Sequence, residues 1–144
     1  MAQDVRSQKA DALLKSLQQQ QGGQLKIFLG AAPGVGKTCA MLNAAKECMQ
    51  QGVKVTVGLI ETHGRADTEA MLQDFTILPR RELNYHGQQL TEFDLDAALA
   101  AKPELILVDE LAHTNVPGSR HKRRYQDIAE LLSAGINVYT TLNV

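Results

Sequence analysis

Four residues in the stretch GVGKT have the types and the spacing that bind phosphate. Gly34 and Gly36 allow the backbone to curl closely around an oxyanion. Lys37 can reach the β- and γ-phosphates of a nucleotide, and the Thr38 hydroxyl can join the ligand shell of a Mg²⁺ ion. The sequence therefore predicts a phosphate-binding loop between a strand and a helix. The alternative is a glycine-rich turn that binds nothing.

The loop departs from the general motif G-x-x-x-x-G-K-[ST] at its first position. That motif places a glycine five residues before Gly36, where this chain has Ala31, and Gly30 is one residue too early. A small residue suffices there if its backbone stays at negative φ, because the residues that face phosphate come later. We therefore expect phosphate binding to be kept. The expected nucleotide-binding residues are Pro33, Gly34, Val35, Gly36, Lys37, Thr38 and Cys39.

Two acidic residues, Asp109 and Glu110, close the apolar run LILV. An acidic residue at the end of a buried strand orients Mg²⁺ in phosphate-loop proteins. We therefore expect Asp109 to share the metal with Thr38. Glu110 can polarise a water molecule or a substrate hydroxyl. The alternative is that these acids only cap the following turn.

The segment ETHGR, residues 61–65, also follows an expected strand. The carboxyl ends of strands carry the ligand crevice in open α/β sheets. Glu61 can therefore act as a general base toward a hydroxyl acceptor, and Arg65 can offset phosphate charge. Equally, these two side chains can simply pair with each other.

A basic run, RHKRR, occupies residues 120–124 and has three possible tasks. Arg120 or Arg124 can reach a γ-phosphate in the same chain or in a neighbouring chain. The run can instead bind an acidic partner or lipid headgroups. It can also be a solvated helix start, although basic residues there oppose the helix dipole. His113 is expected to be structural, because no second ligand stands at a metal-binding spacing.

The elements that must position these residues alternate along the chain. Strands are expected at 25–30, 53–60, 104–110 and 136–144, and helices at 37–52, 66–75, 91–103 and 123–135. Thr91 or Asp94 is expected near the start of the third helix. A short strand or hairpin is expected around 83–85, with His86 and Gly87 as its turn. The alternation predicts an α/β fold: a three-layer sandwich like that of P-loop NTPases, with a mostly parallel sheet.

Length and charge bound the organisation of the chain. Its 144 residues fit one nucleotide-binding domain at 24–144, after an N-terminal helix and linker at 1–23. The net charge of −1 predicts no nucleic-acid partner. No apolar run reaches the roughly 18–20 residues that span a bilayer, and no signal peptide opens the chain. Cys39 and Cys48 favour a reduced, cytoplasmic compartment. The chain stops at Val144, at the end of an expected strand, so we expect a fragment of a longer protein.

Three segments carry a resemblance to a known family. They are FLGAAPGVGKTCAML, VGLIETHGRADTEAML and the run that begins LPRRELNYHG and continues to the end. They resemble the N-terminal cytoplasmic domain of the KdpD family, membrane sensor histidine kinases that control high-affinity potassium uptake. The resemblance covers the chain from about residue 24, and Ala31 is the residue usual in that family.

The resemblance implies an ATP-binding domain with ATP and Mg²⁺ as cofactors, bound through Gly34, Gly36, Lys37, Thr38 and Asp109. It implies a cytoplasmic domain of an inner (plasma) membrane protein. The implied partners are the remaining domains of the parent kinase, a response regulator bound through the C-terminal core, and a potassium-transport protein. The family's phosphoacceptor histidine and kinase ATP site lie in that core, so none of the four histidines here takes that role.

Three functions stay open at the level of sequence. The domain can bind ATP and report its state to the distant kinase core. It can itself be a P-loop kinase that transfers the γ-phosphate to a protein hydroxyl. In that case Glu61 or Glu110 is the base, and Arg120 or Arg124 stabilises the charge. A small-molecule kinase is the third reading, although the sequence shows no acceptor pocket for it.

Overall fold

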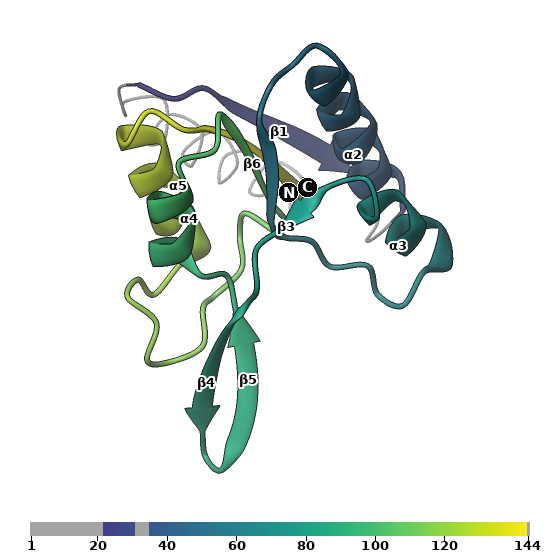
Figure 1. Ribbon diagram of the computed structural model, residues 1–144. Helices are drawn as coiled ribbons and strands as arrows, with labels where there is room; N and C mark the ends of the chain where they lie inside the picture. Colours follow the sequence, from purple (N-terminus) through teal and green to yellow (C-terminus); the bar gives the residue numbers. More distant parts are fainter. Residues whose placement is uncertain (1–21, 31–34, 144) are drawn as a thin grey trace, which may run out of the picture.

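The computed structural model describes residues 22–30 and 35–143 (Figure 1). Most of the helix and linker expected at 1–23, together with Ala31, Pro33 and Gly34, therefore lies outside the described residues. The elements in chain order are β1 (Leu25–Gly30), α2 (Val35–Gln50), β2 (Val55–Leu59), α3 (Ala66–Leu72), β3 (Thr76–Ile77), β4 (Arg81–Tyr85), β5 (Gln88–Glu92), α4 (Leu95–Ala101), β6 (Leu105–Val108), α5 (Arg124–Ser133) and β7 (Asn137–Asn143).

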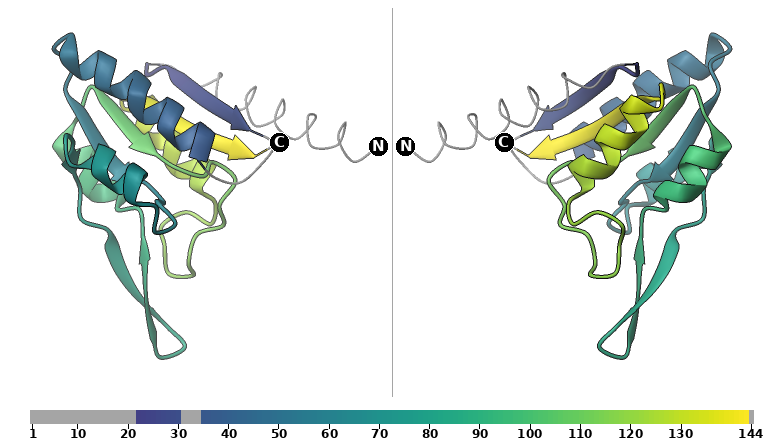
Figure 2. Two further views of the ribbon diagram at one scale, coloured as in Figure 1. Left: turned by 90° about the vertical axis from the view of Figure 1, so that its right-hand side faces the viewer. Right: turned by 90° about the vertical axis from the view of Figure 1, so that its left-hand side faces the viewer.

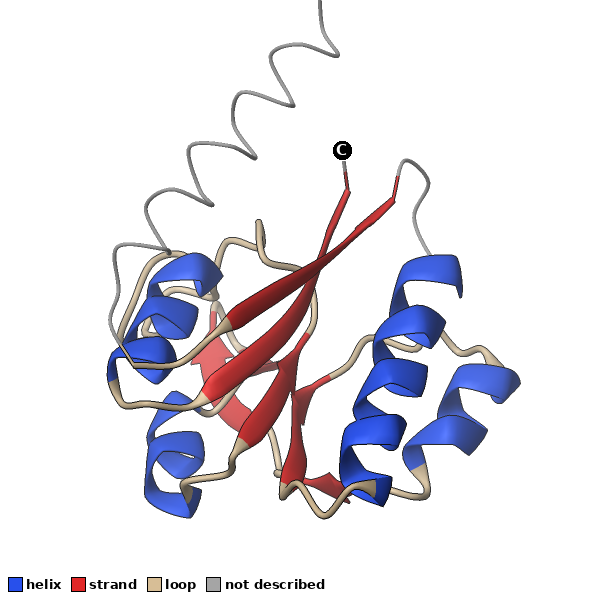
Figure 3. Cartoon of the chain, turned by 90° about the horizontal axis from the view of Figure 1, so that it is seen from above, coloured by secondary structure: helices blue, strands red, loops and turns tan. Residues whose placement is uncertain are grey.

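A five-stranded parallel sheet, in the order β1-β7-β6-β2-β3, forms the middle layer. Helices α2 and α3 cover one face of the sheet, and α4 and α5 cover the other, as Figure 3 shows from above. The predicted α/β sandwich with a mostly parallel sheet is confirmed. Its carboxyl edge carries the ends of β1 and β7 and the loops that follow β2 and β6.

The inner strands β2 and β6 are buried because helices cover both of their faces. All residues of β2 and β6 are buried. The core beneath α4 and α5 includes Phe93, Ile106, Ile128, Leu131 and Val138. The core beneath α2 and α3 includes Met41, Leu42, Val57, Phe75 and Leu107. These two cores hold the strand ends, and thus the loops that follow them, in fixed positions.

Local signals set the ends of the helices. Asp94 is the N-cap of α4, where its Oδ1 accepts a hydrogen bond from the backbone N–H of Ala97 at 3.0 Å. Thr91, the other residue expected near this helix start, lies within β5 instead. Gly52, with φ 93°, follows the end of α2, and Gly135, with φ 86°, follows the end of α5. Left-handed backbone of this kind favours glycine.

The predicted hairpin is present and projects away from the sandwich (Figure 2). Strands β4 and β5 pair antiparallel, and His86 and Gly87 form the turn with φ of 49° and 77°. Strand β3 was not predicted. It has only two residues, both exposed, which are too few to show an alternating pattern.

None of the helices within the described part is long and apolar enough to cross a membrane. Cys39 and Cys48 are free thiols and half-buried, and Cys48 Sγ lies 3.4 Å from the hydroxyl of Tyr139. Both sit on α2, as the sequence predicts.

One glycine inside the sheet is required by packing. Gly58 lies in β2 where the register with β6 shifts, between Val57 and Leu59. A Cβ atom added at Gly58 would lie 2.6 Å from Cε1 of Phe93 and 3.0 Å from Cδ1 of Ile106. These distances are shorter than van der Waals contact, so Gly58 allows the Phe93 ring to pack against the sheet.

The substitution Gly58→Ala is expected to lower the free energy of unfolding by about 1–3 kcal/mol, because the added methyl overpacks the core. Urea denaturation followed by circular dichroism measures this change. Gly36→Ala is the matched control for stability, since a Cβ there meets nothing within 4 Å. If both variants unfold at the same urea concentration, the packing of Phe93 on Gly58 is looser than described.

Candidate functional site

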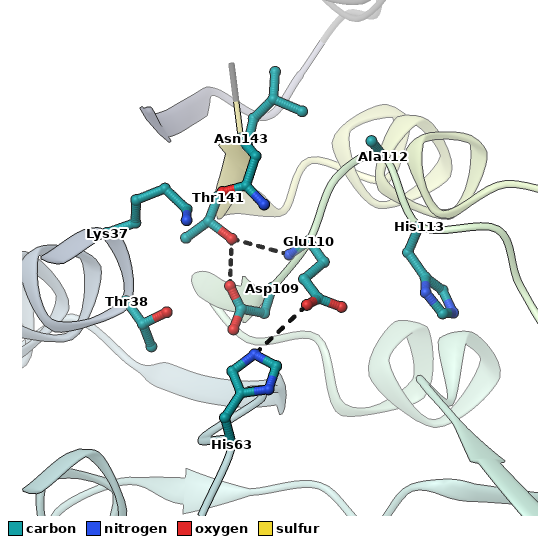
Figure 4. A pocket seen from close by; sticks show the side chains of 10 residues that line it. Lys37, Thr38, His63, Asp109, Glu110, Ala112, His113, Thr141 and Asn143 are labelled. Atoms are coloured by element: carbon teal, nitrogen blue, oxygen red, sulfur yellow. Dashed lines mark hydrogen bonds and ion pairs between the residues drawn. The ribbon is translucent and has the colours of Figure 1, made fainter. Parts of the chain in front are cut away.

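A cleft of about 240 Å³ opens at the carboxyl edge of the sheet (Figure 4). Residues from α2, from the loops after β2 and β6, and from the end of β7 line it. They are Lys37, Thr38, His63, Asp109, Glu110, Ala112, His113, Thr141, Leu142 and Asn143. Lys37 and Thr38 thus share one cleft with Asp109, which comes from a distant part of the sequence.

Helix α2 contributes the basic and hydroxyl groups of the cleft. It begins at Val35, so Lys37 and Thr38 lie in its first turn, and Thr38 is buried. The side-chain stem of Lys37 crosses Gly30, where an added Cβ would lie 2.5 Å from Lys37 Cγ. Gly30 therefore leaves the space that the lysine stem occupies. Cys39, the last of the expected binding residues, is half-buried and is not among those that line the cleft.

Hydrogen bonds fix both carboxylate oxygens of Asp109. The side chain is almost fully buried, and its Oδ2 accepts from the backbone N–H of Glu61 at 3.1 Å. Its Oδ1 accepts from the hydroxyl of Thr141 (Figure 4). The backbone N–H of Asp109 donates to the carbonyl of Leu59 at 2.9 Å. Asp109 is therefore oriented by β2 and β7 together.

Glu110 faces the same cleft but is far more exposed. Its backbone N–H donates to Thr141 Oγ1 at 3.0 Å, and its φ is 61°. The carboxylate points toward His63, with 3.9 Å between Oε1 and the imidazole Nε2 (Figure 4). The two neighbouring acids thus differ: hydrogen bonds hold the Asp109 carboxylate, and the Glu110 carboxylate is exposed in the cleft.

The segment after β2 supports the cleft through its backbone. Apart from holding Asp109, Glu61 pairs its carboxylate with Arg80, at 3.2 Å from Oε1 to Nη1. The expected alternative pairing of Glu61 with Arg65 is thus replaced by one with Arg80, which comes from the loop before the hairpin. Arg65 lies at the N-cap position of α3. Neither Glu61 nor Arg65 is among the residues that line the cleft.

Arg124 supports the turn at Asp109 from inside the protein. Its side chain is 2% exposed, its Nη1 donates to the backbone carbonyl of Asp109 at 2.9 Å, and its Nη2 donates to Glu92 Oε2 at 2.9 Å. Glu92 is also bound by His113, with 2.7 Å between Nε2 and Oε1, and by the backbone N–H of Val116. Arg124 is therefore a buried structural cation in this structure and does not line the cleft.

The rest of the basic run divides between ion pairs and solvent. Arg120 pairs with Asp96 at 2.5 Å and also with Glu130. His121 Nε2 lies 2.8 Å from Glu130 Oε1. Lys122 and Arg123 are exposed. No residue of the run is among those that line the cleft, so the reach of Arg120 or Arg124 to a phosphate stays a prediction.

Two buried carboxylates near Arg124, those of Glu92 and Asp127, have opposite electrostatic environments. Burial favours a raised pKa for Glu92, but the hydrogen bonds from His113 and Val116 and the charge of Arg124 outweigh it and lower the pKa. At Asp127 burial dominates and raises the pKa, although a hydrogen bond from Asn115 opposes it. The fold therefore favours the charged form of Glu92 and disfavours that of Asp127.

Glu92→Gln is expected to lower the free energy of unfolding at pH 7 by about 3–5 kcal/mol, because it leaves the charge of Arg124 buried without its partner. The folded-state pKa of Glu92 is lowered, so its contribution is full above about pH 4.3 and is lost as the pH falls further. The difference from the unsubstituted chain should therefore shrink toward pH 3. Urea denaturation over pH 3–7 measures it.

The matched substitution Asp127→Asn should show the opposite trend. The folded-state pKa of Asp127 is raised, so the unsubstituted chain gains stability relative to this variant as Asp127 takes up a proton on acidification. Parallel pH profiles for the two variants would contradict the opposite environments of Glu92 and Asp127.

The sequence did not point to several residues that complete the site. Gly30 appeared only as a misplaced motif glycine, and its packing against Lys37 depends on tertiary structure. Thr141 lies two residues before Asn143 on β7, so both face the same side of the strand. That alternation was readable, but the position of β7 between β1 and β6 was not. His63 stood inside ETHGR without a partner to identify it.

No cation site is complete in the described residues alone. Across 22–30 and 35–143, no group of three or more His, Cys, Asp or Glu side chains is arranged to hold a metal ion. Thr38 and Asp109 offer oxygen donors, the kind that Mg²⁺ prefers, and Mg²⁺ usually takes its remaining ligands from water and phosphate. The donor set therefore fits a magnesium ion that arrives with a phosphate ligand.

Comparisons with known proteins match nearly the whole described chain. The family model described as "KdpD: Osmosensitive K+ channel His kinase sensor domain" matches residues 21–144. Sensor protein KdpD of Escherichia coli (strain K12) is 56% identical over 93% of this chain and 15% of its own length. The KdpD sensor proteins of Clostridium acetobutylicum and Mycobacterium tuberculosis are 54% and 48% identical over 85% of this chain and 14% of theirs.

The chain spans about one seventh of the length of these relatives, at 14–15%. The matched region includes the cleft-lining residues of α2 and of the loops after β2 and β6. On the family match and on these identities, the chain belongs to the KdpD family of sensor proteins.

Proposed function

We propose that this chain is the ATP-binding regulatory domain of a two-component sensor histidine kinase that controls high-affinity potassium uptake. The observation that carries the proposal is the meeting of Lys37, Thr38 and Asp109 in one cleft at the carboxyl edge of the sheet. A lysine, a hydroxyl and a buried carboxylate are the groups that hold a nucleotide phosphate with its metal. The cleft volume of about 240 Å³ suits the phosphate part of a nucleotide rather than all of it.

Each residue has a defined part in this proposal. The Lys37 ammonium pairs with the β- and γ-phosphates, and the backbone N–H groups at the start of α2 add the positive end of the helix dipole. The Thr38 hydroxyl and the Asp109 carboxylate hold the magnesium ion, directly or through water. That ion neutralises phosphate charge when it is bound. Pro33, Gly34, Val35, Gly36 and Cys39 complete the proposed loop.

The proposed regulatory route begins at Asp109. Its backbone carbonyl binds Arg124, and Arg124 binds Glu92 at the end of the hairpin strand β5. If nucleotide binding shifts the turn at Asp109, this chain of hydrogen bonds would transmit the shift to Glu92 at the base of the projecting hairpin. In the proposed parent protein, this domain lies on the cytoplasmic side of the inner membrane. Its proposed partners are the remaining kinase domains, a response regulator and a potassium-transport protein.

A second candidate function is a P-loop protein kinase, and the exposed Glu110 carboxylate inside the same cleft favours it. Glu110 would accept the proton of an acceptor hydroxyl as that oxygen bonds to the γ-phosphorus and ADP leaves. Glu61 is the less suitable base, because its carboxylate pairs with Arg80 outside the cleft lining. Arg120 from a neighbouring chain is the proposed charge stabiliser, since Arg124 is buried.

The unsubstituted chain is expected to be stabilised by Mg-ATP. At an ATP concentration 100-fold above the dissociation constant, the gain is about 2.7 kcal/mol, or roughly 5–10 °C in the unfolding midpoint. Lys37→Ala and Asp109→Ala should lose most of this shift, and a thermal unfolding assay measures it. Lys46→Ala is the control, because this lysine lies on the same helix but pairs with Asp74 at the surface. An equal shift in all four proteins would refute the proposed site.

Phosphoryl transfer separates the two candidate functions. In the chain incubated with radiolabelled ATP, Mg²⁺ and acceptor proteins, a P-loop kinase labels an acceptor, and Glu110→Gln lowers that labelling by about 10²–10⁴-fold. Binding of ATP without any labelled acceptor supports the regulatory function instead. Glu61→Gln should leave labelling within a fewfold. A loss with Glu61→Gln and none with Glu110→Gln would reverse the assignment of the base.

A further inference from the structure

The imidazole of His63 lies in the cleft without a task in the proposed nucleotide site. It belongs to the loop between β2 and α3, and it lines the same cleft as Lys37 and Asp109. Its side chain is 55% exposed, and its Nε2 lies 3.9 Å from Oε1 of Glu110. Figure 4 shows the ring pointing toward the Glu110 carboxylate, from a different element than Lys37 and Thr38.

The backbone of His63 has a positive φ, which is uncommon for a residue other than glycine. Four non-glycine residues in the described structure have positive φ. Two of them need no further reason, since His86 forms the hairpin turn and Lys102 caps the end of α4. The other two, His63 at 52° and Glu110 at 61°, both line the cleft. Residues in this backbone conformation are energetically unfavourable and concentrate at functional sites.

Hydrogen bonds to neighbouring residues hold the two left-handed residues in place. The backbone N–H of Arg65 donates to the carbonyl of Thr62 at 3.1 Å, which closes the turn around His63. The Thr62 hydroxyl is in turn tied to Glu69 on α3. The backbone of Glu110 is held by Thr141. The fold therefore keeps an unfavourable backbone conformation at two residues of the cleft. His63 presents an imidazole there, and Glu110 presents a carboxylate.

We propose that His63 is a ligand of the terminal phosphate of the bound nucleotide, so that the site distinguishes a nucleoside triphosphate from a diphosphate. This inference rests on the proposed nucleotide site. An imidazole N–H donates a hydrogen bond to a phosphate oxygen, whereas the Glu110 carboxylate can only accept and repels phosphate. His63 offsets that repulsion, and it exchanges its Glu110 partner for the phosphate. A diphosphate lacks the group that His63 would contact.

Titration calorimetry with Mg-ADP and with a non-hydrolysable Mg-ATP analogue tests this role. The unsubstituted chain should bind the analogue more tightly than Mg-ADP. His63→Ala should weaken analogue binding about tenfold, the worth of one hydrogen bond to a charged group, and change Mg-ADP binding less than twofold. His86→Ala is the matched control. It removes a histidine of the same backbone conformation from the hairpin turn, and it should leave both affinities unchanged.

His63→Gly separates binding from folding, because glycine adopts this backbone without strain. This variant should unfold at a higher urea concentration than the unsubstituted chain and yet lose the preference for the triphosphate. If the analogue and Mg-ADP affinities fall together, or neither falls in the His63 variants, His63 is not a ligand of the terminal phosphate. If the unsubstituted chain binds neither nucleotide, the proposed nucleotide site itself is wrong.

Discussion

The arrangement of the cleft depends on the buried ion pair between Arg124 and Glu92. A guanidinium that is 2% exposed must be paired, because an isolated charge in the interior costs several kcal/mol. Arg124 satisfies this need with a carboxylate from the end of β5 and a backbone carbonyl from the end of β6. Three segments far apart in sequence, at 92, 109 and 124, are thereby brought to one point. Arg124 binds the turn that carries Asp109 and Glu110 through the Asp109 carbonyl. The positions of these two acids therefore depend on a buried guanidinium that does not line the cleft.

This arrangement also explains how strained residues persist at the opening. Thr141 binds the carboxylate of Asp109 and the backbone N–H of Glu110, and Arg124 binds the carbonyl between them. A turn fixed from both sides can hold Glu110 in a left-handed conformation that it would not adopt alone. The hairpin β4–β5 depends on the rest of the fold, because an isolated two-stranded hairpin is only marginally stable. Glu92, at its base, is buried and joins it to the site. The turn that carries Asp109 and Glu110 and the projecting hairpin are thus both connected to the buried carboxylate of Glu92.

Pattern and spacing sufficed for the sandwich, the hairpin turn at His86–Gly87 and the grouping of Lys37, Thr38 and Asp109. They sufficed because apolar runs, glycine stops and strand-end acids are local signals. The partner of Glu61 was not local: Arg80 comes from a loop that no periodicity links to residue 61. The burial of Arg124 could not be predicted for the same reason. A basic residue at a helix start is expected to be solvated unless a partner such as Glu92 is known to lie beside it. Thr141 and His63 acquire meaning only once the strand order places β7 and β2 on either side of β6.

The adjacent acids show why this strand order matters for chemistry. Alternation along a strand sends consecutive side chains to opposite faces of the sheet, so a continued β6 would point Glu110 away from Asp109. The left-handed backbone at Glu110 ends the alternation and leaves both acids lining the cleft. Yet they are not equivalent, since hydrogen bonds occupy both oxygens of Asp109 while Glu110 is free to turn toward His63. A buried, oriented carboxylate suits a metal shell, and an exposed one beside an imidazole suits contact with a substrate. One turn of backbone therefore separates two acids into two environments, and the proposed nucleotide site and its proposed response to the terminal phosphate both depend on that separation.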